Sequence, residues 1–417
     1  MIKFILLFLL FFLFWKSNAK TKGAYYSPSS FLFLIYVIGS LCGIFTIKLE
    51  EFREPLTSHY WLPVLFFAFS IVLFLYPFKR FDETKIETIK VPSLRILNLF
   101  STFLIVISFF AIAYFASTFS LIFVMASLGD ARQAIYAGDL FVESGMMNTI
   151  ASVAASLYVF VILLFFVYSA IGGHTIRRIL LLVSSISQPL HILSYVGRDG
   201  VVFWIFTFVF TYLFFRPFLA DEIDKKVKKY FFVVSASLLI PFILISLSRF
   251  ALSDTGTGGS VVSYMGQGFV VGPLYFGLDP MPISYGKAFP IYWEIIGQRP
   301  PEGEGMLQIG EWKSWQFGTF VTSLSRNLGA GGMLVLGLFC YICFANVFGR
   351  IKKNISFHSL FIYNLYFQVY SQGVFYFCQY TRGGNLFIII CFLLFFLFSM
   401  LEKQGNSVYL YKRHQYN

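Results

Sequence analysis

Arginine is prominent in the polar segments that connect the apolar stretches of this chain. Five arginines adjoin the ends of apolar stretches: Arg132, Arg198, Arg249, Arg326 and Arg382. A guanidinium presents a rigid fork of N–H donors that binds two phosphate oxygens at once, and it stays charged when partly removed from water. An arginine near hydrocarbon is costly unless an anion accompanies it. The five arginines therefore predict a site for a lipid-linked phosphate or diphosphate.

A second interpretation of these arginines stays open. Arginines at helix ends commonly extend to lipid headgroups or pair with local acids. Asp130 and Asp199 are close enough in the sequence to pair with Arg132 and Arg198.

The stretch from 249 to 327 is the one long segment that reads as lying outside a bilayer. Its many glycines and prolines predict that it contains no long uninterrupted helix. It is rich in aromatic residues, of which we assign five to glycan binding: Tyr264, Tyr292, Trp293, Trp312 and Trp315. Aromatic faces stack on the C–H surfaces of sugars, so a sugar carried on the lipid would account for them.

The composition shows what must position these residues. The chain has 417 residues, 58% of them hydrophobic and only 12% charged, with a mean hydropathy of +0.74. Such values are typical of an integral membrane protein. Apolar runs long enough to cross roughly 30 Å of hydrocarbon begin near Phe31, Trp61, Ile96, Ile150, Ile179, Val201, Phe231, Leu328, Leu360 and Leu386, and a shorter run covers residues 4–15. We predict an all-α polytopic protein with about eleven transmembrane helices.

The charge distribution predicts the orientation of these helices. If the spans alternate strictly, one side holds 21 of the 32 Lys and Arg residues and 7 of the 20 Asp and Glu residues. The positive-inside rule makes that side cytoplasmic, so the net charge of +12 indicates topology and requires no nucleic acid. We predict transmembrane helices in 1–248 and 328–401, a periplasmic loop at 249–327 and a cytoplasmic tail at 402–417. Residues 1–22 resemble a signal peptide, but alternation favours a short first helix or an interfacial segment that is retained.

Acidic residues outside the long stretch give weaker indications. Glu50 or Glu51 could be the carboxylate that many polyprenyl-phosphate sugar transferases carry in their first outer loop, but the sequence favours a solvated loop beside a helix end as the explanation of this pair. The cluster from Asp221 to Asp224 precedes four lysines and suits a helix start beside an anionic leaflet better than a metal site. We predict no metal and no cofactor.

Several short motifs resemble the oligosaccharide repeat-unit polymerases, the O-antigen polymerases of the Wzy type. They are Leu128-Gly-Asp-Ala-Arg132, Gly197-Arg198-Asp-Gly200, Tyr264-Met-Gly-Gln-Gly-Phe269, Phe320-Val-Thr322 and Asn327-Leu-Gly329-Ala-Gly-Gly332. Asn327 stands where such proteins often carry an acid. The resemblance extends over most of the chain at the level of topology.

The resemblance implies a metal-independent, inverting glycosyl transfer at the periplasmic face of a bacterial inner membrane. The donor would be a glycan on undecaprenyl diphosphate, and the acceptor a single lipid-linked repeat unit of an O-antigen or capsule. The five arginines would stabilise the diphosphate leaving group, and a general base would activate the acceptor hydroxyl. His59, Asp254, Glu294 and Glu311 are all candidates for that base. Partners would be membrane lipids and a chain-length regulator protein.

Two other functions remain to be distinguished from polymerisation. A lipid-linked glycan ligase or polyprenyl-phosphate sugar transferase would share the phosphate site and differ in its acceptor. A lipid-linked oligosaccharide flippase or other transporter belongs to another class. Transporters place charges in the middle of their helices and have short loops, which fits this sequence less well.

Overall fold

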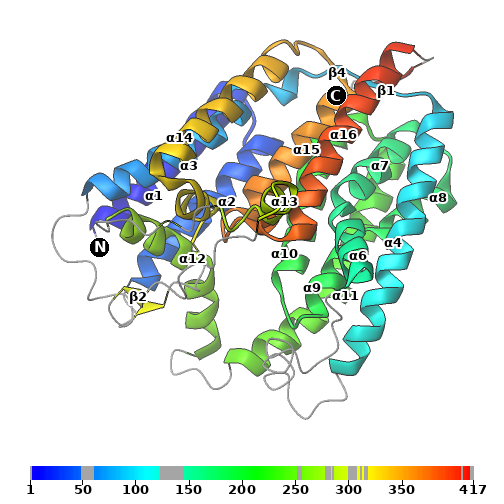
Figure 1. Cartoon of the computed structure of the whole chain (residues 1–417). Coiled ribbons are helices and arrows are strands. Elements are labelled where there is room, and N and C mark those ends of the chain that lie inside the picture. The colour runs from blue at the N-terminus through cyan, green and yellow to red at the C-terminus, as the bar shows by residue number, and fades with distance from the viewer. Residues whose placement is uncertain are drawn as a thin grey trace. The chain divides into compact units, whose positions relative to one another are not determined.

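The computed structural model describes residues 2–47, 61–122, 145–250, 256–277, 283, 286–298, 308–309, 312–313, 318–404 and 407–413. It is mainly helical (Figure 1). The chain divides into two compact units. The first unit comprises Met1–Lys85, Gly258–Lys352 and Val369–Asn385, and the second comprises Ile86–Thr257, Lys353–Gln368 and Leu386–Asn417. Each unit is therefore assembled from three separate parts of the sequence.

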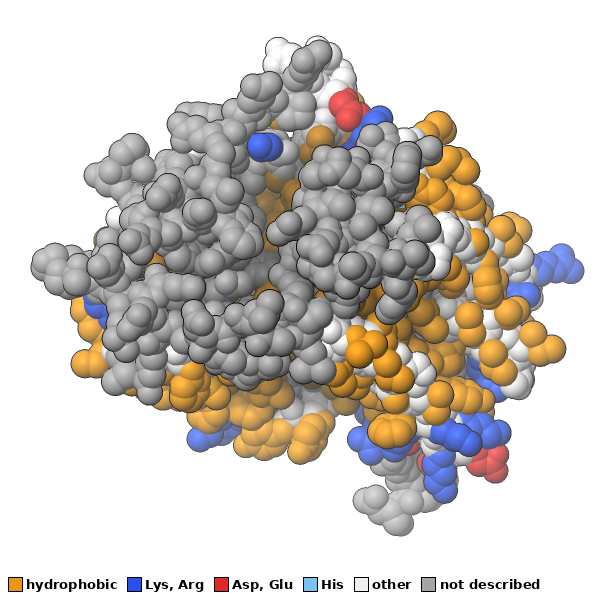
Figure 2. Space-filling model, turned by 90° about the horizontal axis from the view of Figure 1, so that it is seen from below, with side chains coloured by type: hydrophobic (Ala, Val, Ile, Leu, Met, Phe, Trp, Pro, Cys, Tyr) orange, Lys and Arg blue, Asp and Glu red, His pale blue; other side chains and the backbone are white. Residues whose placement is uncertain are grey.

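Nine helices within the described residues are long and apolar enough to cross a membrane. They are Ile2–Lys22, Pro28–Thr46, Trp61–Lys85, Leu94–Ser120, Met146–Ile171, Asp199–Phe218, Asp221–Ser246, Phe320–Gly349 and Arg382–Glu402. Figure 2 shows apolar side chains over much of the part of that face that is not grey, and Leu62, Leu99 and Val335 are among the most exposed apolar residues. Apolar helices with apolar exteriors are the pattern of a multi-pass membrane protein, as the composition predicts.

Two of the eleven predicted spans do not form helices of that length. The run near Ile179 is divided into α8 (Thr175–Ser184) and α9 (Ser187–Leu193). Pro189 explains the division, because a proline has no N–H to donate and its ring would clash with the carbonyl of Ser185 in a continuous helix. The run near Leu360 forms α15 (Phe357–Gln372), whose 16 residues reach only about 24 Å.

The first unit contains helices from both ends of the chain. Its elements are α1 (Ile2–Lys22), α2 (Pro28–Thr46), α3 (Trp61–Arg80), η3 (Glu83–Lys85), most of α12 (Gly256–Phe276), α13 (Pro290–Ile295), β2 (Gln308–Ile309), β3 (Trp312–Lys313), α14 (Phe320–Gly349) and η5 (Cys378–Tyr380). Helix α1 packs on α2, and α3 packs on α14. Gly337 of α14 permits close approach to α3, because a Cβ there would lie 2.9 Å from Leu73 Cδ2.

The prediction of no long helix in 249–327 is wrong, because α12 has 21 residues. Two of its glycines serve close packing. A Cβ on Gly266 would lie 2.4 Å from the backbone of Cys42 in α2, and one on Gly272 would lie 2.2 Å from the Phe67 ring in α3. Pro273 lies in the last turn of α12, where it removes only one hydrogen bond.

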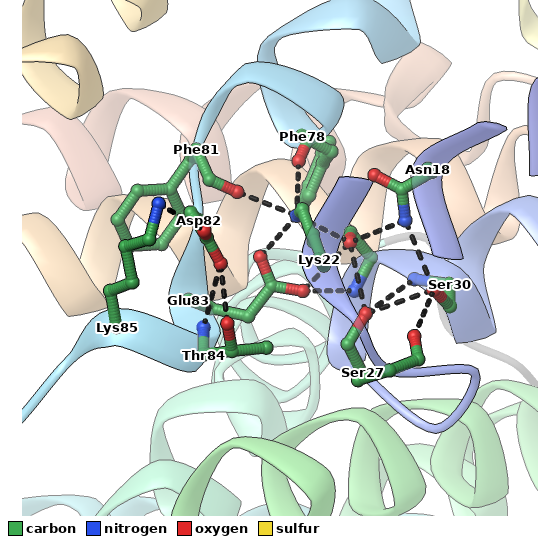
Figure 3. A network of polar contacts seen from close by, with 12 residues as sticks. Asn18, Lys22, Ser27, Ser30, Phe78, Phe81, Asp82, Glu83, Thr84 and Lys85 are labelled. Carbon is green, nitrogen blue, oxygen red and sulfur yellow. Dashed lines mark hydrogen bonds and ion pairs between the residues drawn. The ribbon is translucent and has the colours of Figure 1, made fainter. Parts of the chain in front are cut away.

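A buried polar network joins α1, α2 and η3 at one end of the first unit (Figure 3). The Lys22 ammonium pairs with the Glu83 carboxylate and donates to the carbonyls of Phe78 and Phe81. Glu83 also accepts from the backbone N–H and the hydroxyl of Ser29. Helix α1 is therefore longer than the predicted short first helix, and its last turns are buried against α2 and η3.

The second unit is a helical bundle with a small sheet. Its elements are β1 (Thr88–Val91), α4 (Leu94–Ile122), α6 (Met146–Ser156), α7 (Tyr158–Ile171), α8, α9, α10 (Asp199–Phe215), η4 (Arg216–Phe218), α11 (Asp221–Phe250), β4 (Asn354–Ser356) and β5 (Val408–Tyr411), together with most of α15 and of α16 (Arg382–Gln404). Strand β1 pairs in parallel with β4 and antiparallel with β5. The fold is thus all-α in its spans, with short strands in their connections.

Candidate functional site

Residues 286–298, named the strap here, form the longest described stretch of the connection between α12 and α14. The strap starts at Gly286, whose φ of +84° favours glycine. Its helix α13 begins with Pro290, which has the φ that a first helical position needs. The Trp293 indole N–H donates to the Gly286 carbonyl at 3.0 Å. Gly297 ends α13 with a φ of +70°, where its N–H bonds to the Glu294 carbonyl.

Two asparagines bind the strap to the beginnings of two helices. Asn327, in the second turn of α14, accepts the Ala288 N–H through its side-chain oxygen at 2.7 Å. The Asn327 carbonyl accepts the Gly286 N–H at 2.9 Å. Asn385, in the first turn of α16, donates to the Ala288 carbonyl at 3.1 Å. Ala288 is therefore bonded on both of its backbone polar groups, and α14 and α16 hold the same short segment.

Arg382 is the first residue of α16 and contacts the strap directly. Its Nη2 lies 3.1 Å from Oε2 of Glu294 in α13. The neighbouring residues fix this turn, since the Thr381 hydroxyl accepts the Gly384 N–H at 3.1 Å. Gly384 is required by close approach, because a Cβ there would lie 2.7 Å from Gln379 Cα. The arginine-glycine sequence thus places a guanidinium beside a carboxylate that was a candidate general base.

Arg326 lies one residue before Asn327, inside α14 rather than at the helix end that the sequence predicted. The helix begins at Phe320, eight residues earlier than the apolar run. Burial raises the pKa of Tyr275 in α12 to about 12, and the positive charge of Arg326 opposes that rise. Gly329 interrupts α14 with a φ of +72° and a ψ of 166°. Arg326 therefore precedes a break in the helix by three residues.

Arg198 belongs to the second unit, in the hairpin between α9 and α10. It is 4% exposed, and its Nη1 donates to the Ser246 hydroxyl of α11 at 3.1 Å. The flanking glycines permit this tight hairpin. A Cβ on Gly197 would lie 2.6 Å from the Ile192 side chain, and one on Gly200 would lie 2.7 Å from it. Close packing against Ile192 thus explains the two glycines of this motif. The tight hairpin holds the Arg198 guanidinium inside the protein.

The described aromatic candidates differ in how much of their surface is free. Tyr292 of α13 is exposed, and its ring meets the Trp293 ring edge to face with centroids 5.3 Å apart. Tyr264 of α12 packs against Phe375 with centroids 5.6 Å apart. Tyr292 therefore offers the most accessible ring on the strap, whereas Trp293 uses its N–H to close the strap.

Several predicted residues lie outside the described residues: His59, Arg132, Asp254, Glu311 and Trp315. For Arg249 and Trp312 the structure describes the backbone alone. The acidic pair Glu50 and Glu51 also lies outside. Sequence reasoning did not assign a role to Asn385, and the only signal was its position one turn after Arg382. Asn327 was noted for the missing acid, and its side chain proves to fasten the strap.

No group of three or more His, Cys, Asp or Glu side chains that could hold a metal ion occurs in the described part of the chain. The chain matches no family model, no curated protein and no solved structure.

Proposed function

We propose that the chain is a glycosyltransferase that polymerises oligosaccharide repeat units carried on undecaprenyl diphosphate at the periplasmic face of a bacterial inner membrane. The observation that carries this proposal is the convergence on the strap. Two helix segments, each bearing an arginine, hold a segment that carries a carboxylate and an exposed tyrosine. A cation for the leaving group, a base and a stacking surface are what glycosyl transfer from a lipid diphosphate needs.

In the proposed reaction the diphosphate of the donor binds Arg382 and Arg326. The Arg382 side chain is 61% exposed and the Glu294 side chain 43% exposed, so separating this pair costs only about 0–1 kcal/mol. A diphosphate also accepts two hydrogen bonds from the guanidinium, and it carries more negative charge than the single carboxylate of Glu294. Binding of the donor would therefore release Glu294.

The released carboxylate then serves as the general base. The acceptor hydroxyl oxygen attacks the anomeric carbon of the donor, and its proton passes to Glu294. The bond between the anomeric carbon and the diphosphate oxygen breaks, and undecaprenyl diphosphate leaves with its charge stabilised by arginine. The sequence-based assignment of Arg132, Arg198 and Arg249 to the diphosphate stays a prediction. Tyr292 stacks on a sugar ring.

The test compares arginine variants in a strain of the source organism that lacks this chain. We expect Arg382→Lys to abolish the ladder of long surface glycan on a gel while single repeat units remain attached, because lysine keeps the charge and loses the bidentate fork. Arg350→Lys is the matched control, since Arg350 follows α14 at an exposed position. A normal ladder from Arg382→Lys at equal protein abundance would remove Arg382 from the site. Loss of single repeat units as well would indicate ligation rather than polymerisation.

A further inference from the structure

A serine, a histidine and a glutamate of the second unit are joined side chain to side chain, and none of the roles described above involves them. The Ser356 hydroxyl oxygen lies 3.2 Å from Nε2 of His358. On the other side of the ring, Nδ1 of His358 lies 2.9 Å from Oε2 of Glu402. Hydroxyl, imidazole and carboxylate in this order are the groups that activate a serine for attack on a carbonyl carbon.

Glu402 holds His358 at two points. Its Oε1 accepts the backbone N–H of His358 at 3.0 Å, and its Oε2 faces Nδ1. The Glu402 side chain is 4% exposed, so water competes little for the carboxylate. Because an ionised carboxylate only accepts hydrogen bonds, Nδ1 carries the proton of the neutral ring, and the lone pair of Nε2 is left for Ser356. This is the tautomer that a general base needs.

Ser356 ends β4 on the accessible face of the small sheet. It pairs in register with Lys90 of β1, which in turn pairs with the exposed Tyr409 of β5. Ile355 is buried and points to the opposite face, since successive residues of a strand alternate. The His358 side chain is 24% exposed. A substrate can therefore reach the hydroxyl and the imidazole from outside the protein.

The three residues lie at one end of a candidate membrane span. Glu402 ends the span that Arg382 begins, roughly 30 Å away along α16. The hydrocarbon of a bilayer has about that thickness, so Glu402 lies near the level of lipid ester groups. The Phe395 ring meets the His358 ring edge to face with centroids 5.4 Å apart, and Met400 is 64% exposed. These surroundings suit an ester that carries a hydrocarbon chain.

We propose that Ser356, His358 and Glu402 hydrolyse the acyl ester of a membrane lipid, independently of the proposed glycosyl transfer. The Ser356 oxygen attacks the ester carbonyl carbon, and its proton passes to Nε2 of His358. The bond from that carbon to the alcohol oxygen breaks, and the alcohol leaves with the proton. Lys90, whose Nζ donates to the Glu402 carbonyl at 3.2 Å, supplies a nearby positive charge that favours the negative oxygen of the intermediate.

A water molecule completes the proposed reaction. Its oxygen attacks the carbonyl carbon of the acyl-serine, and His358 takes its proton. The bond between that carbon and the Ser356 oxygen breaks, the fatty acid leaves, and His358 returns the proton to the serine. The reaction thus consumes one ester and one water and needs no oxidant or metal.

A second contact of Ser356 sharpens the test. Its hydroxyl donates to the Ser359 hydroxyl at 2.8 Å and accepts the Ser359 N–H at 3.4 Å, in the first turn of α15. A hydroxyl has one proton, so donation to Ser359 competes with donation to His358. Ser356 also caps α15 through the Ser359 N–H, and capping alone would require no reactivity. We therefore expect Ser359→Ala to retain or increase the reactivity of Ser356.

Labelling of the purified full-length protein with an alkyl fluorophosphonate tests the proposal, because this reagent reacts with activated serines. Peptide mass spectrometry should place the label on Ser356. His358→Gln should slow labelling about a hundredfold or more. Glu402→Gln should also slow it, since an amide can donate to Nδ1 and favours the wrong tautomer. Ser93→Ala is the matched control, since Ser93 is also half-buried and directly precedes a helix, α4.

A further variant separates catalysis from capping. Ser356→Asn keeps a side chain that caps helices well and removes the nucleophile, so it should fold and take no label. In mixed micelles of phosphatidylethanolamine, the wild type should release fatty acid and Ser356→Asn should not. An unlabelled wild type, or labelling that His358→Gln leaves unchanged, would overturn the proposal and leave Ser356 a helix cap. A labelled protein that releases no fatty acid would overturn the assignment of the substrate.

Discussion

The Arg382 Nη2 atom lies 3.1 Å from Glu294 Oε2, which joins the first residue of α16 to the strap through two partly exposed side chains. An exposed ion pair contributes only about 0–1 kcal/mol to folding. Its position beside Ala288, which Asn327 and Asn385 hold from two helices, matters more than its strength. In the proposed transfer, the Arg382 guanidinium leaves this pair to bind the diphosphate, and the Glu294 carboxylate is freed to act as the base.

We predict that Glu294→Gln changes the free energy of unfolding by less than about 1 kcal/mol while it abolishes polymerisation. The amide retains the shape of the side chain but cannot accept the proton of the acceptor hydroxyl. Thermal unfolding of the purified variant and its surface-glycan ladder are the two measurements. A normal ladder would remove Glu294 from the candidates for the base.

Asn327→Ala should destabilise the protein by about 1–3 kcal/mol, because it leaves the Ala288 N–H and the Ser323 carbonyl without their side-chain partner. Asn327→Asp should also destabilise, since an aspartate cannot donate to the Ser323 carbonyl. Asn354→Ala, at an exposed position in β4, is the control and should be nearly neutral. Denaturant unfolding in mild detergent measures the difference. Equal stabilities of the Asn327 and Asn354 variants would show that the strap is not fastened in this way.

Gly329→Ala should cost about 1–3 kcal/mol, because its φ of +72° with a ψ of 166° is a conformation that side chains strongly disfavour. Space is adequate, since the nearest atom to an added Cβ is Ile283 Cδ1 at 3.4 Å. Gly331→Ala offers a close comparison two residues away, where an added Cβ meets nothing within 4 Å. We expect that variant to be neutral or slightly stabilising. Melting temperatures that rank the two variants in the opposite order would contradict a required break at Gly329.

Lys22→Met should destabilise the first unit by about 3–5 kcal/mol, because it leaves Glu83 buried without its cation. The side chains of Lys22 and Glu83 are 1% and 2% exposed. The nearby pair of Lys85 and Asp82 is the control, since the Lys85 side chain is 73% exposed and its loss should cost about 0–1 kcal/mol. Combining Lys22→Met with Glu83→Gln should recover part of the loss. A double-mutant cycle with no coupling would show that the buried pair is not a unit.

The membrane spans could be predicted from sequence because continuous apolar runs leave the chain no alternative to helices in lipid. The runs at Ile179 and Leu360 show the limit of this reasoning. Hydropathy ignores the missing N–H of Pro189, and it cannot show that Phe357 begins a helix of only 16 residues. Helix α12 was missed for a related reason. Its many glycines and prolines were taken to exclude a long helix, whereas Gly266 and Gly272 let helices approach closely.

The sequence predicted which kinds of residue belong to the candidate site. It did not predict which of them are in contact. Arg198 and Arg382 were predicted to adjoin the ends of apolar stretches, and in the structure they lie at the starts of α10 and α16. The pairing of Arg382 with Glu294 depends on how the strap folds, and that is determined by the hydrogen bonds of Asn327 and Asn385. No local pattern specifies such bonds between residues distant in the sequence.

The order of strands in the small sheet has a consequence for biosynthesis. Strand β1 is synthesised early, but its two neighbours β4 and β5 come from residues 354–356 and 408–411. At about 5–20 residues per second, the ribosome needs on the order of tens of seconds to supply them. One edge of β1 lacks its partner until β4 is made, and the other lacks its partner until residue 408 and those after it are made, so the sheet of the second unit is completed only late in synthesis.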